Sequence, residues 1–101
     1  MIERQAMDAK GRVKVTFVLA EGGIDGQVAV VGDFNGWDPT AAPLRKRGGR
    51  RVASVFLLPG RRYAFRYLGE GGQWFNDDAA DDYEPNEYGG SDSVVDLSER
   101  P

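Results

Sequence analysis

The clearest fold signal in this chain is the stretch Arg51-Val52-Ala53-Ser54-Val55-Phe56-Leu57-Leu58-Pro59-Gly60-Arg61-Arg62-Tyr63-Ala64-Phe65-Arg66-Tyr67-Leu68. Residues 51–58 and 62–68 are rich in β-branched and aromatic residues, and the pair Pro59-Gly60 between them is typical of a turn. In the second run, one face carries Tyr63, Phe65 and Tyr67, and the other face carries Ala64 and Arg66. We therefore expect two strands joined as a hairpin.

Further strands are expected on both sides of this hairpin. Apolar residues alternate along the run 13–19, which predicts a strand with one face in the core. The run 27–32 is β-branched and bounded by glycine, as in a central strand buried on both faces. Shorter strands are expected at 73–75 and 93–97, with a turn at 21–26 and loops at 39–49 and 76–90. This spacing predicts an all-β sandwich of about six to eight short antiparallel strands.

The length of 101 residues allows one domain, which we place at residues 12–98 after a disordered or frayed leader at 1–11. No segment has the length of a membrane span or the apolar core of a signal peptide, so we expect a soluble, cytoplasmic chain with no membrane partner. The chain has no cysteine and no histidine, which removes thiol chemistry and the commonest metal ligand and proton shuttle. We therefore expect no enzymatic activity, no cofactor and no metal site.

The charged residues are segregated along the chain. Between Asp38 and Glu70 there are basic residues and no acid, whereas the segment from Glu70 to Glu99 contains ten acids and no base. Such blocks suggest a polyanion site, but none of the usual nucleic-acid-binding motifs accompanies them, so no nucleic-acid partner is expected. Neighbouring blocks of opposite sign can instead neutralise each other in the fold.

The acidic residues of the 76–90 loop have two further interpretations. They could ligate calcium, but their spacing lacks the alternating acids and central glycine of an EF-hand loop, so a solvated loop is the preferred interpretation. They could also serve a glycosidase, which needs one carboxylate as acid and another as base or nucleophile. A chain this short has little room for a deep cleft with two separately tuned carboxylates, so catalysis is not expected.

The two tryptophans suggest a binding surface. Each follows a glycine-rich turn, in Gly32-Asp33-Phe34-Asn35-Gly36-Trp37 and in Gly71-Gly72-Gln73-Trp74, where a large ring can be held half exposed. An indole can cover the apolar face of a sugar ring while polar groups bond the hydroxyls. The polar residues within reach of the tryptophans in sequence are Asn35, Gln73, Asn76 and Arg66. The alternative, in which one or both rings fill the core, stays open.

Four segments occur in a fixed order along the chain: 30–37, 57–67, 72–74 and 89–95. In this order they resemble the family 48 carbohydrate-binding modules. This family includes the glycogen-binding domain of the AMP-activated protein kinase β-subunit and the N-terminal early set domains of isoamylase and glycogen branching enzymes. The resemblance implies an immunoglobulin-like β-sandwich that binds α-1,4-linked glucans of the glycogen or starch type without cleaving them.

The resemblance also implies roles for individual residues. Trp37 and Trp74 match the two stacking tryptophans of the family. Asp92 falls where the family usually has an asparagine that bonds sugar hydroxyls, and Tyr88 falls where the kinase-type module has a leucine that protrudes into the helical glucan. The kinase-type lysine after the strand tyrosine is replaced by Ala64, and Arg66 can substitute for it with a planar guanidinium. With the two nearby amides, the predicted carbohydrate-binding residues are Trp37, Trp74, Asp92, Tyr88, Arg66, Asn35 and Asn76.

A second possibility is a protein-interaction or regulatory early set domain without glycan binding of its own. Its partner would be a glucan-processing enzyme rather than an α-glucan polysaccharide or maltooligosaccharide. Buried tryptophans, or a large exposed apolar patch elsewhere, would favour this second possibility.

Overall fold

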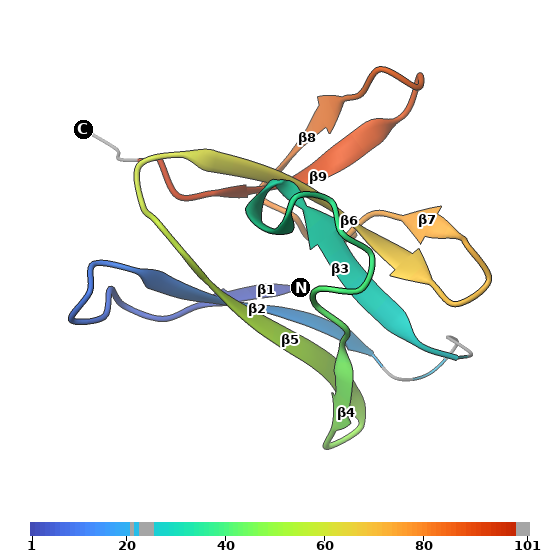
Figure 1. The fold of residues 1–101 in the computed structure, drawn as a ribbon, viewed down its shortest axis with the longest axis horizontal. Coiled ribbons are helices and arrows are strands. Elements are labelled where there is room, and N and C mark those ends of the chain that lie inside the picture. The colour runs from blue at the N-terminus through green and yellow to red at the C-terminus, as the bar shows by residue number, and fades with distance from the viewer. Residues whose placement is uncertain (21, 23–25, 99–101) are drawn as a thin grey trace.

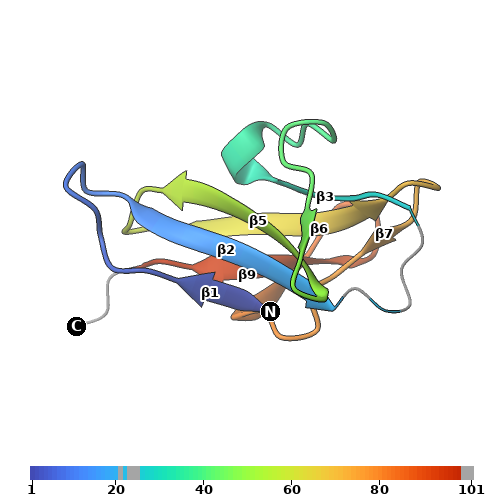
Figure 2. The same ribbon diagram turned by 90° about the horizontal axis from the view of Figure 1, so that it is seen from below.

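The computed structural model describes residues 1–20, 22 and 26–98. These residues form nine strands and one short 3-10 helix, η1 (Asp33–Asn35). The first sheet has the strand order β1 (Ile2–Arg4), β2 (Val13–Ala20), β5 (Arg50–Leu57), β4 (Arg45–Arg47). The second sheet has the order β3 (Val28–Gly32), β6 (Arg62–Gly69), β9 (Ser91–Asp96), β8 (Asp82–Pro85), and β7 (Trp74–Phe75) also pairs with β6. The two antiparallel sheets form two layers, as Figures 1 and 2 show.

The predicted all-β sandwich is confirmed, but the described residues contain nine strands instead of about six to eight. The periodicity does not predict β1, β4 and β8, and all three lie at the edges of the sheets. Their residues are almost all exposed. Because an exposed edge strand buries no face, it carries no alternation of apolar and polar residues.

The predicted hairpin at 51–68 is wrong, because β5 and β6 belong to different sheets. β5 pairs with β2 and β4, whereas β6 pairs with β3, β7 and β9. The connecting segment crosses the edge of the sandwich, where the Tyr63 hydroxyl donates to the carbonyl oxygen of Leu58 at 2.8 Å. This crossing sets the aromatic face of β6 against the first sheet: the rings of Phe65 and Phe17 have centroids 4.8 Å apart. Burial of the apolar faces of the two sheets against each other therefore stabilises the fold more than direct pairing of β5 with β6 would.

The core lies between the sheets and follows the predicted alternation. On β2 the buried side chains include Val15 and Phe17, both 0% exposed. On β6 the aromatic face of Tyr63, Phe65 and Tyr67 is buried. The opposite face of β6, with Ala64 and Arg66, points outward and is only partly covered. The outward face of β6 is therefore available for a function other than packing.

β3 is fully buried, as predicted, but it is not a central strand. It ends the second sheet, next to β6. Its free edge is covered by the segment 42–44, since the Val30 N–H donates to the Ala42 oxygen at 3.0 Å and the Leu44 N–H donates to the Val28 oxygen at 2.8 Å. An irregular segment of the predicted 39–49 loop thus replaces a neighbouring strand.

Two further segments predicted to be irregular, besides 39–49, are partly ordered by edge pairing. Within the predicted leader at 1–11, Ile2–Arg4 pairs with β2 and satisfies its outer edge. Within the predicted 76–90 loop, β8 pairs with β9 from Asp82 to Pro85. Both departures have the same cause, because an unpaired strand edge exposes backbone donors and acceptors that a short neighbouring segment can satisfy. The predicted turn at 21–26 lies mostly outside the described residues.

Gly32, at the end of β3, should not tolerate a side chain. A Cβ atom placed there would lie 2.7 Å from the Cβ of Phe65 and would also clash with the Ala64 carbonyl oxygen. We expect Gly32→Ala to destabilise the domain by about 1–3 kcal/mol, as overpacking does. Denaturant unfolding checks this, with Gly22→Ala as the control, since a Cβ at Gly22 meets nothing within 4 Å. Equal stability of the two variants would contradict the close approach of β3 and β6.

Candidate functional site

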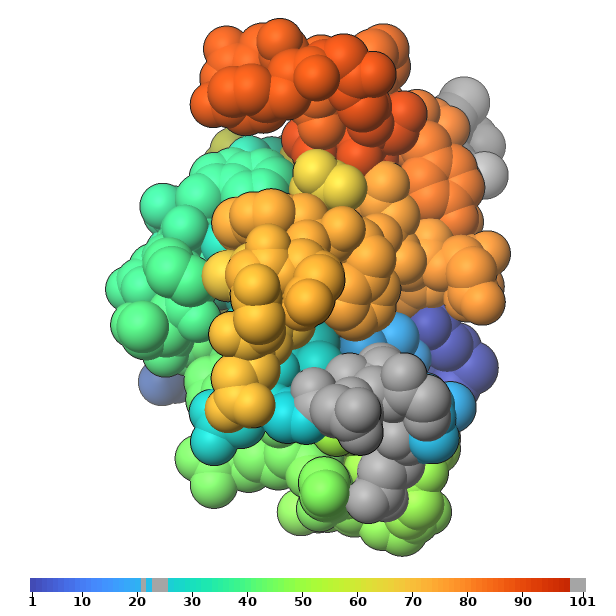
Figure 3. All heavy atoms as spheres, turned by 90° about the vertical axis from the view of Figure 1, so that its right-hand side faces the viewer, coloured from blue at the N-terminus to red at the C-terminus, as the bar shows by residue number. Residues whose placement is uncertain are grey.

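The outward face of β6 forms the floor of an open groove of about 810 Å³. Figure 3 shows the hollow below the orange-red loop that joins β8 to β9, beside the segment of η1 and the segment of β7. The groove is lined by Asp33, Trp37, Ala64, Arg66, Trp74, Asn86, Glu87, Tyr88 and Asp92. Five of the seven predicted carbohydrate-binding residues are therefore brought together, from segments that are far apart in the sequence.

Trp37 is fixed by the turn that follows β3. Its backbone has a φ of 57°, the left-handed region in which a bulky residue is rare. Its indole N–H donates to Asp33 Oδ1 at 3.0 Å, and the other oxygen of Asp33 accepts the Ala64 N–H at 2.8 Å. One carboxylate thus ties the indole to β6. Because the ring N–H is already bonded, the face of the ring is what Trp37 offers to a ligand.

Trp74 lies on the other side of the groove and is 44% exposed. It occupies β7, where it pairs with Leu68 of β6. The turn before it is closed by the Gly72 N–H, which donates to the Gly69 oxygen at 3.0 Å. A short strand behind a tight turn therefore presents the ring of Trp74 outward. Trp37 is partly buried, so neither tryptophan is a fully buried core residue.

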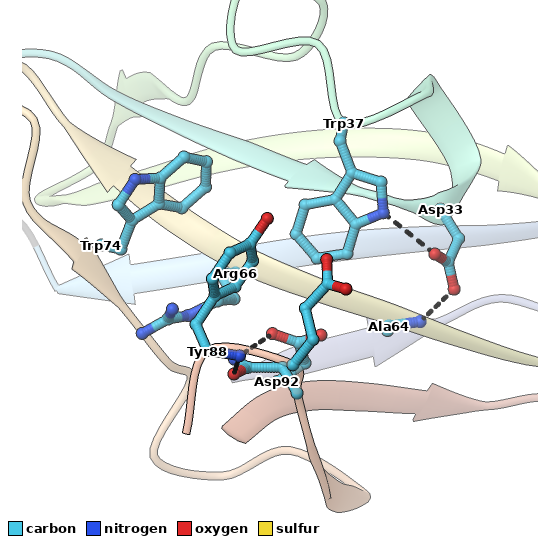
Figure 4. Close-up of a pocket in the computed structure, with 9 residues that line it drawn as sticks. Asp33, Trp37, Ala64, Arg66, Trp74, Tyr88 and Asp92 are labelled. Atoms are coloured by element: carbon cyan, nitrogen blue, oxygen red, sulfur yellow. Dashed lines mark hydrogen bonds between the residues drawn. The ribbon is translucent and has the colours of Figure 1, made fainter. Parts of the chain in front are cut away.

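Arg66 lies between the tryptophans on the floor of the groove (Figure 4). It pairs with Val31 in the ladder of β3 and β6, on the face opposite the aromatic core. Its Nε atom is buried, and in the part of the chain that the structure describes it has no hydrogen-bond partner. A buried donor without a partner costs free energy, so a ligand hydroxyl that accepted from it would bind with a net gain.

Tyr88 and Asp92 approach the groove from the β8–β9 hairpin. Tyr88 is 88% exposed, and Asp92 is partly buried at the start of β9. Asp92 Oδ1 accepts a hydrogen bond from the amide of Asn86 at 3.2 Å. The hairpin therefore adds a third aromatic ring and a carboxylate to the wall of the groove.

The two predicted asparagines are not lining residues, and their amides have structural partners. Asn35 Oδ1 accepts from the Gly32 N–H at 3.1 Å, and its Nδ2 donates to the Val30 oxygen at 3.1 Å. Asn76 Nδ2 donates to the Ser91 oxygen at 2.8 Å, and its Oδ1 accepts from the hydroxyl and the N–H of Ser93. In this structure both amides hold the segments that carry the groove residues, and their direct contact with a ligand stays a prediction.

Sequence reasoning misses three groove residues, namely Asp33, Asn86 and Glu87. Asp33 belongs to the same turn as Trp37, so an aspartate four residues before a half-exposed tryptophan was an available signal. Asn86 and Glu87 precede Tyr88 in the sequence. They line the same groove as Trp37 because they follow β8, a strand that the sequence did not predict. No pattern along the chain reveals that placement.

The acidic residues outside the groove are partly neutralised, as the charge pattern predicts. Arg62 on β6 lies 2.7 Å from Asp82, 3.2 Å from Glu84 and 3.1 Å from Asp96. The hydrogen bond from Arg62 holds the pKa of Asp82 below its usual value. The charge balance in the groove is different, since three carboxylates, those of Asp33, Glu87 and Asp92, face one guanidinium, that of Arg66. Such a surface suits a neutral ligand rich in hydroxyls better than a polyanion.

Part of this chain is similar in sequence to curated branching enzymes. The 1,4-alpha-glucan branching enzyme GlgB of Bordetella pertussis is 49% identical over 49 residues, which are 46% of this chain and 7% of that enzyme. GlgB of Rhodospirillum rubrum is 41% identical over 49 residues, and GlgB of Leifsonia xyli subsp. xyli is 44% identical over 50 residues, with the same shares covered. The chain is similar in part to glucan branching enzymes.

The similarity is restricted to a small segment of each enzyme. The matched region spans about 7% of the length of these relatives, and no protein-family model matches the chain. A small all-β sandwich that resembles a segment of a branching enzyme is a domain of the kind associated with glucan-processing enzymes. Among the described residues, no helix is long and apolar enough to cross a membrane.

Proposed function

We propose that the groove binds an α-1,4-linked glucan of the glycogen or starch type, as a family 48 carbohydrate-binding module does, and that the domain does not cleave it. The observation that carries the proposal is the pair of tryptophans on opposite sides of one groove, with Arg66 between them. The partial similarity to branching enzymes supports the same ligand class.

The proposed binding combines stacking with hydrogen bonds. The axial C–H bonds of a glucose ring form an apolar face that an indole covers, and the hydroxyls form a polar rim. Arg66 can donate to two neighbouring hydroxyls because its guanidinium is planar and carries donors in a fork. Asp92 has a second carboxylate oxygen that can accept from a hydroxyl. The neutral ring and its many hydroxyls fit a groove with an excess of carboxylates.

The groove carboxylates are poorly suited to glycoside hydrolysis. That reaction needs one protonated carboxyl group as acid and a second carboxylate as base or nucleophile. Asp33 accepts hydrogen bonds on both oxygens, from Trp37 and from Ala64, and Asp92 accepts from Asn86. Two of the three acids are thus engaged in holding the groove together, which favours a binding role.

A fluorescence titration with maltoheptaose tests the proposal directly. Two half-exposed tryptophans should report binding, with a dissociation constant of about micromolar to millimolar, or about 4–8 kcal/mol. A β-1,4-linked cello-oligosaccharide of equal length is the matched control, since it has the same composition and a different shape. A response that is absent for maltoheptaose, or equal for both sugars, would overturn the proposal.

A second candidate function is docking to a glucan-processing enzyme without glycan binding. It is favoured by Phe56 and Leu58, which are 52% and 57% exposed at the end of the first sheet, away from the groove. The exposed Trp74 and the partly exposed Trp37 argue against it, since that function does not need them on the surface. If maltoheptaose does not bind, this second function becomes the better explanation.

A further inference from the structure

Tyr88 occupies an unusual position for a large aromatic residue. It is 88% exposed at the tip of the loop that joins β8 to β9, and yet it lines the groove. An exposed ring gains no burial energy in the free protein. A ring on a flexible loop would also lose conformational entropy whenever it closed on a ligand. The value of Tyr88 for binding therefore depends on whether the loop is ordered in advance.

The side chain of Asn86 orders this loop from inside. Its Oδ1 accepts the N–H of Tyr88 at 3.0 Å and the N–H of Gly90 at 3.1 Å. The backbone of Asn86 closes the same loop, since its N–H donates to the Gly90 oxygen at 2.9 Å. One residue thus fixes both sides of the turn that presents Tyr88.

Asn86 is in turn oriented by Asp92. Its Nδ2 donates to Asp92 Oδ1 at 3.2 Å. An amide that donates to a carboxylate has its oxygen turned the other way, toward the two backbone N–H groups. Asp92 lies on β9, which pairs with β6 at the floor of the groove. The contact therefore connects the loop to the rigid sheet.

We propose that Asn86 and Asp92 form a latch that holds Tyr88 over the groove before a glucan arrives. Asn86 is then a positioning residue, and Tyr88 is the ring that touches the sugar. This inference rests on the proposed glucan binding for its effect on affinity. The order of the loop in the free protein does not depend on that proposal and can be measured by itself.

The experiment compares Asn86→Ala and Asn86→Asp with the wild-type chain. Asn86→Ala removes all three side-chain hydrogen bonds, whereas Asn86→Asp removes the donor and sets two carboxylates against each other. Amide hydrogen exchange at Tyr88 and Gly90 should accelerate about fivefold to tenfold in both variants, corresponding to one net hydrogen bond or slightly more. Affinity for maltoheptaose should fall by about the same factor.

A reversed pair provides the rescue. In the double variant Asn86→Asp with Asp92→Asn, the carboxylate and the amide exchange places and can again form a hydrogen bond. Amide exchange at Tyr88 and Gly90 should therefore be no faster in the double variant than in Asp92→Asn alone. In a Tyr88→Ala background the Asn86 variants should cause no further loss of affinity, because the ring that they position is absent. Unchanged exchange at Tyr88 and Gly90, or an equal loss of affinity without Tyr88, would overturn the latch. If the wild-type chain does not bind maltoheptaose, the proposed function fails, and the exchange rates still decide whether the latch exists.

Discussion

A variant that carries both Trp37→Ala and Trp74→Ala will pass through a glycogen or amylose affinity gel without retention. Each ring forms one side of the groove, and truncation of an aromatic contact of this kind costs about 2 kcal/mol. Two such losses lower the affinity by several hundredfold at about 1.4 kcal/mol per factor of ten. From a starting dissociation constant of about micromolar to millimolar, such a loss leaves binding of about millimolar strength at best, which is too weak for retention on the gel. Affinity electrophoresis with glycogen in the gel measures the loss.

The control for this experiment is an exposed aromatic residue outside the groove. Phe56→Ala removes a ring that is 52% exposed and contacts Arg12 on the first sheet. Its retention should equal that of the wild-type chain. Trp37→Gly controls for backbone strain in the alanine variant, because glycine adopts the φ of 57° at this position without strain. Retention of the double alanine variant, with its thermal unfolding still cooperative, would exclude the tryptophans as the glucan site.

The alternation of residues along single strands predicts the parts of this structure that face the core. The aromatic face of β6 is one example, and its reverse face carries Arg66 into the groove, as the same alternation requires. The glycine-rich turns also predict exposed tryptophans, because a ring next to a tight turn cannot be covered by its own strand. Local pattern was sufficient wherever the decisive neighbours belong to the same strand or turn.

The pairing of strands cannot be predicted in this way, because it depends on how segments far apart in the sequence pack together in the core. The pair Pro59-Gly60 permits both a hairpin and a crossing between sheets, and only the burial of β6 against Phe17 selects the crossing. Asn35 and Asn76 illustrate the same limit for polar side chains. Each lies within two residues of a tryptophan, but its amide bonds backbone and side-chain groups that proximity in sequence does not identify. The contact of Asn86 with Asp92 exists only because β8 pairs with β9.

Asp77→Ala should strongly destabilise the domain, with a loss of about 3–5 kcal/mol in the free energy of unfolding. The Asp77 side chain is 0% exposed. Its Oδ2 accepts from the Tyr67 hydroxyl at 2.6 Å and from the amino group of Met1 at 2.7 Å, and its Oδ1 accepts from the Ala79 N–H at 2.8 Å. Removal of the carboxylate leaves these donors without an acceptor in or near the core. Urea unfolding followed by fluorescence measures the change.

Substitution of the neighbouring Asp78 is the control that distinguishes the loss of buried hydrogen bonds from the loss of a negative charge. Asp78 is exposed, so Asp78→Ala should change the free energy of unfolding by less than about 0.5 kcal/mol. Burial and the hydrogen bond to Asp77 raise the pKa of Tyr67, so its hydroxyl remains a donor throughout the usable pH range. Tyr67→Phe alone should cost about 1.5–3 kcal/mol, because the buried Asp77 carboxylate loses a donor. In the Asp77→Ala background it should offset part of the loss, since the unsatisfied hydroxyl is then absent. Strictly additive losses in the double variant would mean that the two groups do not interact. Since β7, which carries Trp74, ends two residues before Asp77, an interaction between Asp77 and Tyr67 would also make this buried carboxylate an anchor for one wall of the groove.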